Sequence, residues 1–355
     1  MKIAICGDVH ISKTSSIVTG KGNKYTKRLE NCIETLNWFE KMSKKKGCEM
    51  EIFLGDVFDA PNIDAEIITA LNDIQWNKTP KKFICGNHEM GSNDLVFNSL
   101  NVLSHIGEVI TEPKIDGVFG SELIYLPYIL ENKRKPMEQY INETREKTYK
   151  DTFTTQEVKN VIMFSHNDIK GLQYGKMVSK IGFEIEEYER FADKIINGHI
   201  HNQCQVGEKI INIGNITGQS FNEDAEKYNH TMGVLDTLTL SLELIQNPYA
   251  FNFYKFEILK EEDIKEKLSI CKNNSVLSIK TYDKYIEEIK KQLSEKENII
   301  AYKFNIKPLP KDIEETQNKF EDIVSVNYQE QFSNCMLEKL GNSDIVKEEL
   351  VEIFR

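Results

Sequence analysis

The chain has 355 residues, of which 40% are hydrophobic, and it carries a formal net charge of −11. This length exceeds the usual size of a single hydrophobic core, so one large domain with a smaller appendage is expected. A pI near 5.3 excludes a protein coated in basic surface, so any polyanion would have to bind locally.

The seven cysteines are odd in number, spread along the chain and without a Cys-x-x-Cys pair. This usage indicates a reduced, cytoplasmic chain that holds no structural zinc cluster. The N-terminus opens directly into a strand pattern, which argues against a signal peptide. No apolar run approaches the roughly 20 residues that cross a bilayer, so no membrane association is expected.

Strands and helices are predicted to alternate along the first 245 residues. The expected strands are 2–6, 49–54, 82–85, 122–129, 161–164, 194–197, 209–213, 232–236 and 240–245. The expected helices are one from about 29 that stops at Gly47, then about 64–76, 93–105 and 136–151. Such alternation favours a mixed or parallel sheet covered by helices, whose loops gather at the carboxyl ends of the strands.

After Asn247-Pro248 the pattern changes to strands 253–259, 276–281 and 299–306 with a helix at 285–296. The step Pro308-Leu309-Pro310 reads as a linker, because prolines discourage both helix and central strand. Amphipathic helical patterns follow it. We therefore expect a main domain over 1–247, a small α/β domain over 248–307, and a linker with partner-binding helices over 308–355.

Five loops share one layout, in which an apolar strand is followed by a small residue and then by side chains that commonly bind metals. They are Cys6-Gly7-Asp8-Val9-His10, Leu54-Gly55-Asp56-Val57-Phe58-Asp59, Cys85-Gly86-Asn87-His88-Glu89, Phe164-Ser165-His166 and Asn197-Gly198-His199-Ile200-His201. Of the seven histidines, five fall in these loops, which indicates a shared site rather than chance.

The spacing within these loops is suited to chelation. Asp8 and His10 lie two residues apart, so in an extended segment both side chains point the same way, and His199 and His201 do the same. Carboxylate, amide and imidazole ligands suit Mn²⁺, Fe²⁺ or Zn²⁺ better than Ca²⁺. Asp56, at the end of a buried strand, is the candidate bridge between two ions. Turn aspartates with core histidines, or a mononuclear site, are the alternatives.

These loops resemble the calcineurin-like metallophosphoesterase superfamily, whose pattern is Asp-x-His, Gly-Asp-x-x-Asp, Gly-Asn-His-Asp/Glu, a lone His and Gly-His-x-His. The resemblance implies an α/β (α+β) fold, a β-sandwich flanked by helices. It also implies that the first ion is held by Asp8, His10, Asp56 and His201, and the second by Asp56, Asn87, His166 and His199.

The resemblance further assigns His88 as the catalytic imidazole beside the scissile phosphate. Glu89 stands where the family pattern usually has Asp, and it is expected to support His88. Two Mn²⁺ ions are the expected cofactors, with Fe²⁺, Mg²⁺ or Zn²⁺ as alternatives. Such ions polarise phosphoryl oxygens and acidify water for hydrolysis of the ester.

Within the superfamily, the chain looks most like the nuclease subunit of the SbcC/SbcD complex, the meiotic-recombination-eleven family, in its phage recombination-endonuclease branch. The similar stretches are residues 1–10, 55–59, 214–221 and 233–237. The resemblance implies a Mn²⁺-dependent 3′–5′ exonuclease on duplex DNA and endonuclease on single strands or hairpins. It would act with a coiled-coil ABC-type ATPase in double-strand break repair and recombination.

Two other functions remain open from the sequence. The chain could be a metallophosphoesterase acting on small nucleotides or phosphoproteins, or a scaffold that keeps the fold without catalysis. The eight matched side chains favour an enzyme, because a binding module does not need them. The chain has no Gly-x-x-x-x-Gly-Lys-Ser/Thr loop, so the ATPase would be a separate subunit.

Contacts with DNA and partners are predicted from charge and from apolar patterns. A basic loop directly after the Asp8/His10 pair is a candidate DNA contact through Lys13, Lys21, Lys24, Lys27 and Arg28. The family resemblance suggests a homodimer through the helices near 64–76 and 93–105, with core packing as the alternative for their apolar residues Ile67, Ile68, Leu71, Leu95, Leu100 and Leu103. The C-terminal helices are expected to dock on the ATPase.

Overall fold

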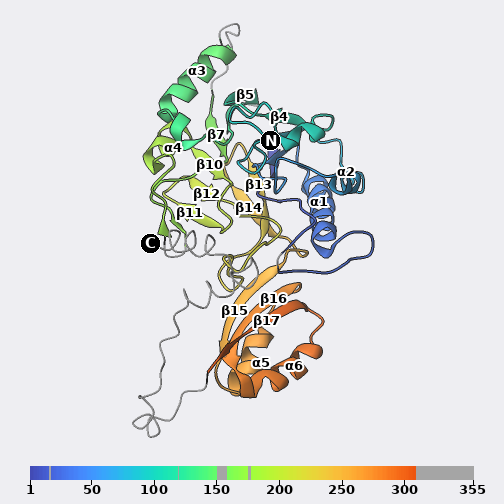
Figure 1. Cartoon of the computed structure of the whole chain (residues 1–355). Coiled ribbons are helices and arrows are strands. Elements are labelled where there is room, and N and C mark those ends of the chain that lie inside the picture. Colours follow the sequence, from blue (N-terminus) through green and yellow to red (C-terminus); the bar gives the residue numbers. More distant parts are fainter. Residues whose placement is uncertain (16, 119, 150–157, 175–176, 309–355) are drawn as a thin grey trace, which may run out of the picture. The chain divides into compact units, whose positions relative to one another are not determined.

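The computed structural model describes residues 1–15, 17–118, 120–149, 158–174 and 177–308 (Figure 1). Met1–Lys307 forms one compact unit. At its centre two six-stranded mixed sheets pack face to face, with helices on both outer sides. The predicted α/β sandwich flanked by helices is therefore confirmed. The helices predicted after Pro308 lie outside the described residues.

The first sheet has the strand order β14-β13-β1-β2-β3-β4. Strands β1 to β4 run parallel, whereas β13 pairs antiparallel with β1 and β14 pairs antiparallel with β13. The strand bounds are β1 Lys2–Cys6, β2 Met50–Phe53, β3 Lys81–Ile84, β4 Glu108–Ile110, β13 Thr231–Asp236 and β14 Leu242–Gln246. Parallel neighbours place their carboxyl ends at the same edge, which is where the predicted ligand loops begin.

The second sheet has the order β11-β12-β10-β7-β6-β5, with a parallel centre and an antiparallel strand at each edge. The strand bounds are β5 Lys114–Val118, β6 Ser121–Leu126, β7 Asn160–Ser165, β10 Lys194–Asn197, β11 Cys204–Val206 and β12 Ile210–Asn212. The two sheets thus share one plan, because each has parallel strands in the middle that lead into ligand loops.

Alternation along β1 explains how one strand serves two cores. Ile3 and Ile5 pack between the sheets together with Phe164 of β7, whereas Ala4 and Cys6 belong to the cluster beneath the helices. Successive side chains on a strand point to opposite faces, and both faces of this strand are covered. A continuous apolar run is the pattern that such a strand requires.

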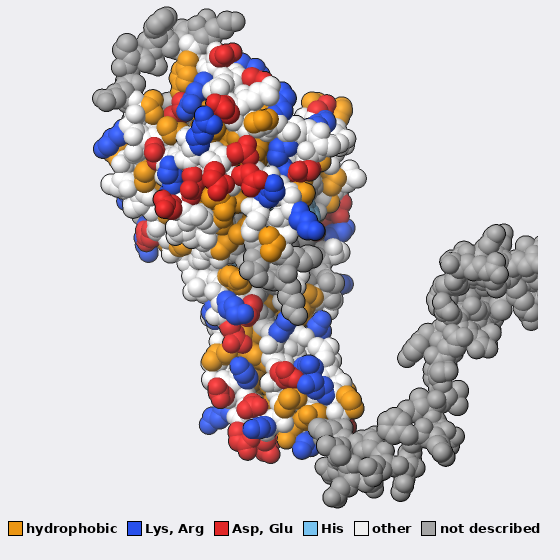
Figure 2. Space-filling model, turned by 90° about the vertical axis from the view of Figure 1, so that its left-hand side faces the viewer, with side chains coloured by type: hydrophobic (Ala, Val, Ile, Leu, Met, Phe, Trp, Pro, Cys, Tyr) orange, Lys and Arg blue, Asp and Glu red, His pale blue; other side chains and the backbone are white. Residues whose placement is uncertain are grey.

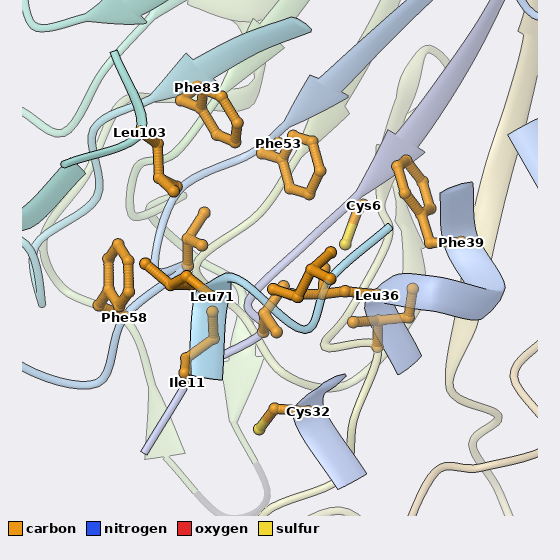
Figure 3. Packing of buried hydrophobic residues seen from close by; sticks show 14 of the residues in the cluster. Cys6, Ile11, Cys32, Leu36, Phe39, Phe53, Phe58, Leu71, Phe83 and Leu103 are labelled. Carbon is orange, nitrogen blue, oxygen red and sulfur yellow. The ribbon is translucent and has the colours of Figure 1, made fainter. Parts of the chain in front are cut away.

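Helix α1 (Lys27–Lys46) covers the outer face of the first sheet. It begins at Thr26, whose side chain accepts a hydrogen bond from the backbone of Leu29, and ends at Gly47 with φ of 68°. Its predicted end is confirmed, since a left-handed residue closes a helix best when it is glycine. Figure 3 shows Phe39 of α1 near Phe53. Phe53 stacks on Phe83 at 4.7 Å between ring centroids.

The other helices of the sandwich divide between its two outer faces (Figure 1). Residues of α2 and η1 pack in the same core as α1, whereas those of α3 and α4 pack on the second sheet. The short elements η2 and the hairpin β8-β9 lie between α-helices in sequence. The bounds are α2 Ala65–Leu71, η1 Ser99–Leu103, η2 Glu131–Lys133, α3 Met137–Tyr149, β8 Gln173–Tyr174, β9 Met177–Val178 and α4 Ile185–Phe191.

After Pro248 the chain builds a separate parallel sheet with the order β15-β16-β17. One face is covered by α5 and α6, whose Ile264, Leu268, Ile289 and Leu293 pack on Tyr254 and Leu277. The bounds are β15 Asn252–Ile258, α5 Glu262–Ser269, β16 Ser275–Tyr282, η3 Asp283–Tyr285, α6 Ile286–Ser294 and β17 Ile299–Lys307. The expected strands of this region are present, and α5 is an additional helix.

The helices predicted near 64–76 and 93–105 are much shorter than expected. The first ends at Leu71, and the second is a 3-10 turn that starts only at Ser99. Residues before it form a hydrogen-bonded loop in which Gly91 donates to Phe97 and Leu95 has φ of 61°, which no right-handed helix allows.

Most of the apolar residues named for a dimer face belong to the core of the chain itself. Five of them are buried, namely Ile67, Leu71, Leu95, Leu100 and Leu103. Ile68 is 46% exposed, and the neighbouring Val96 and Phe97 are 60% and 72% exposed. A dimer through this region would therefore depend on Ile68, Val96 and Phe97. Within the described part of the chain, no helix combines the length and apolar character needed to cross a bilayer.

Candidate metal centre

The five predicted ligand loops converge at one edge of the sandwich. Three follow β1, β2 and β3 of the first sheet, and two follow β7 and β10 of the second. Hydrogen bonds connect them directly. The His10 backbone N–H donates to the Asp56 carbonyl at 2.8 Å, and the His199 N–H donates to Asp8 Oδ1 at 3.0 Å. Loops separated by almost 200 residues thus form one continuous wall.

The backbone is strained where the predicted ligands lie. Asp8, His10, Asp56 and His199 all have positive φ, at 48°, 49°, 47° and 72°. A non-glycine residue in this region costs of order 1–3 kcal/mol and persists only where the surroundings enforce it. The strain therefore concentrates at the positions that aim side chains into the site.

Two glycines allow the loops to approach one another. A Cβ atom on Gly55, which has φ of 87°, would lie 2.4 Å from Nδ1 of His166. A Cβ atom on Gly86 would lie 2.3 Å from Oδ1 of Asp56. Both distances are far below van der Waals contact, so any other residue would displace a predicted ligand.

The first group of ligand atoms comes from Asp8, His10 and His201, which lie within 4.8 Å of one another. The far nitrogen of each imidazole is held by a carboxylate. Nδ1 of His10 bonds to Asp59 at 3.1 Å, and Nδ1 of His201 bonds to Glu223 at 3.0 Å. Such acceptors fix the tautomer that leaves Nε2 to bind a metal.

The second group consists of Asp56, His166 and His199, again within 4.8 Å. Asn87 joins it, because its Oδ1 lies 3.2 Å from His166 Nε2 and 2.9 Å from His199 Nδ1. The other ring nitrogens are occupied, since His166 Nδ1 bonds to the Leu54 carbonyl and His199 Nε2 to Asp168 at 3.2 Å. The seven predicted ligands are therefore brought together.

Asp56 lies between the two groups. Its Oδ2 is 3.2 Å from His166 Nε2 and 3.8 Å from His10 Nε2. This is the placement that a carboxylate shared by two ions requires.

The residues present fit divalent cations. His10 Nε2 is enclosed and has no hydrogen-bond partner in the described part of the chain, as expected for a nitrogen that binds a metal. Burial opposes the protonation of His166, but the charge of Asp56 outweighs it and raises the His166 pKa to about 10. Burial raises the pKa of Asp56, yet the His166, His10 and His88 rings bring it well below its ordinary value. The negative charge of Asp56 thus favours a positive charge beside it, which a divalent cation held by Asp56 and His166 would supply.

His88 lies within ligand distance of His10 and Asp56 but is more exposed than the other histidines of the site. Its ring is 40% exposed, and Nδ1 lies 3.0 Å from the Asp59 carbonyl. The ring packs edge-on against His10 with centroids 4.6 Å apart. A solvent-facing imidazole beside the ligands is suited to exchange a proton with a substrate.

Glu89 was expected to support His88, but it bonds to other groups. Its buried carboxylate accepts hydrogen bonds from the backbone N–H groups of Asp56, Phe58 and Gly86 at 2.8–2.9 Å. Glu89 therefore stabilises the loop that contains Asp56. The contact to His88 comes instead from the backbone carbonyl of Asp59.

Sequence reasoning did not assign Asp59, Asp168 and Glu223, which hold the histidine rings. Two of them carried a local signal, because Asp59 ends the Gly-Asp-x-x-Asp motif and Asp168 lies two residues after His166. Glu223 lies 22 residues beyond His201 and is brought to it only by folding.

Some basic side chains of this loop are bound to other groups of the chain, and others are exposed to solvent. Arg28 is 4% exposed and donates to the carbonyls of Val9, His10 and Gly218, so the predicted DNA contact does not apply to it. Lys13 pairs with Asp64 and Lys24 with Asp73. Lys21 and Lys27 are exposed. On the face drawn in Figure 2, basic and acidic side chains are interspersed.

A sandwich of two mixed sheets, with two ligand groups and Asp56 close to both at the ends of its strands, is typical of hydrolases that use two metal ions. The model of the calcineurin-like phosphoesterase family matches residues 1–203, and the chain belongs to this family. The matched range contains every predicted ligand. Membership implies a metal-dependent hydrolase of phosphoesters with a dinuclear centre.

Among solved structures, one described as the crystal structure of TT1561 of Thermus thermophilus is 11% identical to this chain, with a TM-score of 0.41. The match covers 69% of this chain and 98% of that chain. A search of curated proteins found no match.

Proposed function

We propose that the chain is a Mn²⁺-dependent DNA nuclease and the nuclease subunit of an SbcC/SbcD-type repair complex. Hydrolysis of a phosphoester is supported above all by one observation. The Asp56 carboxylate lies between two ligand groups and next to the exposed His88 ring. The choice of DNA is supported by the resemblance of residues 1–10, 55–59, 214–221 and 233–237 to that nuclease family.

The small sheet adds support for a polyanionic substrate. Lys255, Ser278 and Lys303 form one cross-strand row on β15, β16 and β17, so their side chains share a face. Both lysines are exposed, and Lys303 Nζ lies 4.8 Å from the centre of the Phe221 ring. Cationic rows with an adjacent aromatic ring are a common means of contacting a nucleic-acid backbone.

The chemistry follows from the positions of the side chains. Two divalent cations, when bound, polarise the phosphoryl oxygens and acidify a water molecule. Asp59 and Glu223 hold the His10 and His201 rings in the ligand orientation. His88 Nδ1 is engaged by the Asp59 carbonyl, which leaves Nε2 to donate a proton to the departing oxygen.

The test is hydrolysis by the purified chain with Mn²⁺ of labelled duplex DNA, single-stranded DNA, p-nitrophenyl phosphate and a phosphopeptide. We expect cleavage of DNA, no cleavage after chelation, and weak hydrolysis of the monoesters. Preference for a monoester would favour the alternative of a phosphatase for small nucleotides or phosphoproteins. Inactivity on every substrate with both ions bound would favour a scaffold.

The proposed partner is a coiled-coil ABC-type ATPase that binds the region 308–355, which lies outside the described residues. Deletion of residues 312–355 should preserve Mn²⁺-dependent cleavage, because every predicted ligand lies at or before His201. It should abolish co-purification with the ATPase. Retained co-purification would refute this docking site.

We also propose a homodimer through the exposed loop and helix residues Ile68, Val96 and Phe97. In sedimentation at the same concentration, the wild type should be a dimer and Phe97→Asp should be a monomer. A monomeric wild type at micromolar concentration would refute the dimer.

A further inference from the structure

A polar cavity of about 280 Å³ lies beside the metal centre. Its walls come from the loop after β1, from Arg28 of α1, from Asp59, from Gln219, and from Phe251 and Phe253 at the start of the small sheet. Small-molecule sites usually enclose about 300–1,000 Å³. The cavity therefore has room for one small group and not for a macromolecular segment.

The cavity walls connect directly to residues of the metal centre. Asp59 bonds through Oδ1 to His10, and its carbonyl lies 3.0 Å from His88 Nδ1. On another wall, the Gln219 N–H donates to Glu223 at 2.7 Å, and Glu223 holds His201. Asp59 therefore lines the cavity and also contacts both His10 and His88.

The hydrogen-bonding groups of the cavity favour a neutral polar ligand. The Nε2 atom of Gln219 is enclosed and has no hydrogen-bond partner in the described part of the chain, so it is a donor in need of an acceptor. The half-exposed Asp59 carboxylate is an acceptor and repels a second phosphate. The positive charge of Arg28 is opposed by the Asp59 carboxylate on the same cavity, and the Arg28 guanidinium donates to the carbonyls of Val9, His10 and Gly218.

We propose that this cavity binds the sugar of the nucleoside esterified to the attacked phosphate. A pentose is neutral, small, and carries both hydroxyl donors for Asp59 and oxygen acceptors for Gln219. This assignment rests on the proposed nuclease function. It makes Gln219 and Asp59 determinants of substrate choice, with Gln219 acting on binding of the sugar rather than on the chemistry at phosphorus.

The test compares three phosphodiesters under the same Mn²⁺ conditions. They are the p-nitrophenyl ester of thymidine 5′-monophosphate, the same ester of abasic 2-deoxyribose 5-phosphate, and bis(p-nitrophenyl) phosphate, which has no sugar. In the wild type, kcat/KM should be higher for both sugar esters than for bis(p-nitrophenyl) phosphate. Gln219→Leu should reduce the ratio of each sugar ester to the sugarless ester by roughly three- to tenfold, the value of one hydrogen bond.

Two further variants make the result specific. Gln205→Leu changes an exposed glutamine on β11 and should leave the ratio unchanged. Thr14→Val alters an exposed residue on another wall, so it provides a second measurement should Gln219→Leu fold poorly. It should lower the same ratio.

Ratios unchanged in both cavity variants, or a preference that requires the thymine base, would overturn the sugar assignment while the nuclease function stands. A wild type that hydrolyses none of the three diesters, nor DNA, would instead refute the nuclease function.

Discussion

At the scale of single residues, the metal centre depends on acceptors that orient imidazole rings. Asp59 holds His10 with its carboxylate and His88 with its carbonyl. One residue therefore positions both a predicted ligand and the predicted proton donor. A substitution at Asp59 removes the acceptor of His10 but keeps the backbone carbonyl that His88 contacts.

His88→Ser should retain both metal ions and lose most of the turnover. A missing general acid typically lowers kcat by roughly 10²–10⁴-fold. Because His88 also lies within ligand distance of His10 and Asp56, its role is open to a direct test. The measurements are the metal content by inductively coupled plasma mass spectrometry and kcat on DNA. Together they decide whether His88 is a proton donor or a metal ligand. A loss of one ion in this variant would make His88 a ligand.

Glu89→Gln should destabilise the fold. The carboxylate accepts from three buried N–H groups, those of Asp56 and Gly86 through one oxygen and that of Phe58 through the other. A glutamine must turn its NH₂ toward at least one of these donors, and each buried donor left unpaired costs about 1–3 kcal/mol. Urea unfolding should therefore show a loss of at least about 1–3 kcal/mol, and exposed Glu208→Gln should show none. Equal stability of both variants would contradict the role of Glu89.

The ligands could be predicted from sequence because strand, small residue and ligand follow one another within a few positions. Their supporting residues could not, since Glu223 and the Glu89 contacts arise from packing between loops. Arg28 was misjudged for the same reason. Its charge pattern resembles a surface loop, but folding buries it against carbonyls of two distant segments.

At the scale of elements, α1, β2 and β3 are joined by a buried charge cluster. Lys81 of β3 lies 3.2 Å from Glu40 of α1 and 2.8 Å from Glu51 of β2, and all three side chains are enclosed. One ammonium cannot balance two ionised carboxylates in a medium of low polarity. Burial and the charge of Glu51 accordingly raise the pKa of Glu40 to about 7.

This pKa predicts a pH dependence of stability. The folded chain keeps a proton on Glu40 that an unfolded glutamate, with a pKa of 4.5, releases. The resulting stabilisation is complete below pH 4.5 and is lost as the pH rises through about 7, by an amount on the order of a few kcal/mol. Glu40→Gln should flatten this decline in chemical unfolding measured from pH 5 to 8. Glu112→Gln, at an exposed site, should not, and an unchanged slope in Glu40→Gln would refute the assignment.

The strongly patterned elements were predictable, as α1, β1 and β10 demonstrate. The strands β4, β5 and β11 were not, because their exposed positions carry polar residues without regular alternation. The helix expected near 93–105 is largely replaced by a loop, because side chains bond to the backbone before Ser99. Ser92 and Asp94 hydrogen-bond each other and the backbone, which stabilises a loop in place of the first helical turns.

At the scale of the whole molecule, metal binding should stabilise the fold. Ligand loops from both sheets meet at the centre, so ions bound there stabilise the native state alone. An ion at a free concentration of 100 times its Kd adds about 2.7 kcal/mol. Chelation should lower Tm, and added Mn²⁺ should restore it. Asp56→Asn removes the shared charge, so its Tm should respond only weakly to Mn²⁺; a full response would refute the shared carboxylate.

The place of β1 in its sheet has a consequence for biosynthesis. Residues Lys2–Cys6 pair on one side with β2 and on the other with β13, which ends at Asp236. Contacts over so large a sequence separation form slowly, and a chain emerging from the ribosome cannot make this pairing until residue 236 has been synthesised. The sheet that carries the Asp8 and His10 loop therefore stays incomplete until β13 has emerged. We expect the nascent chain to remain inactive until synthesis has passed β13.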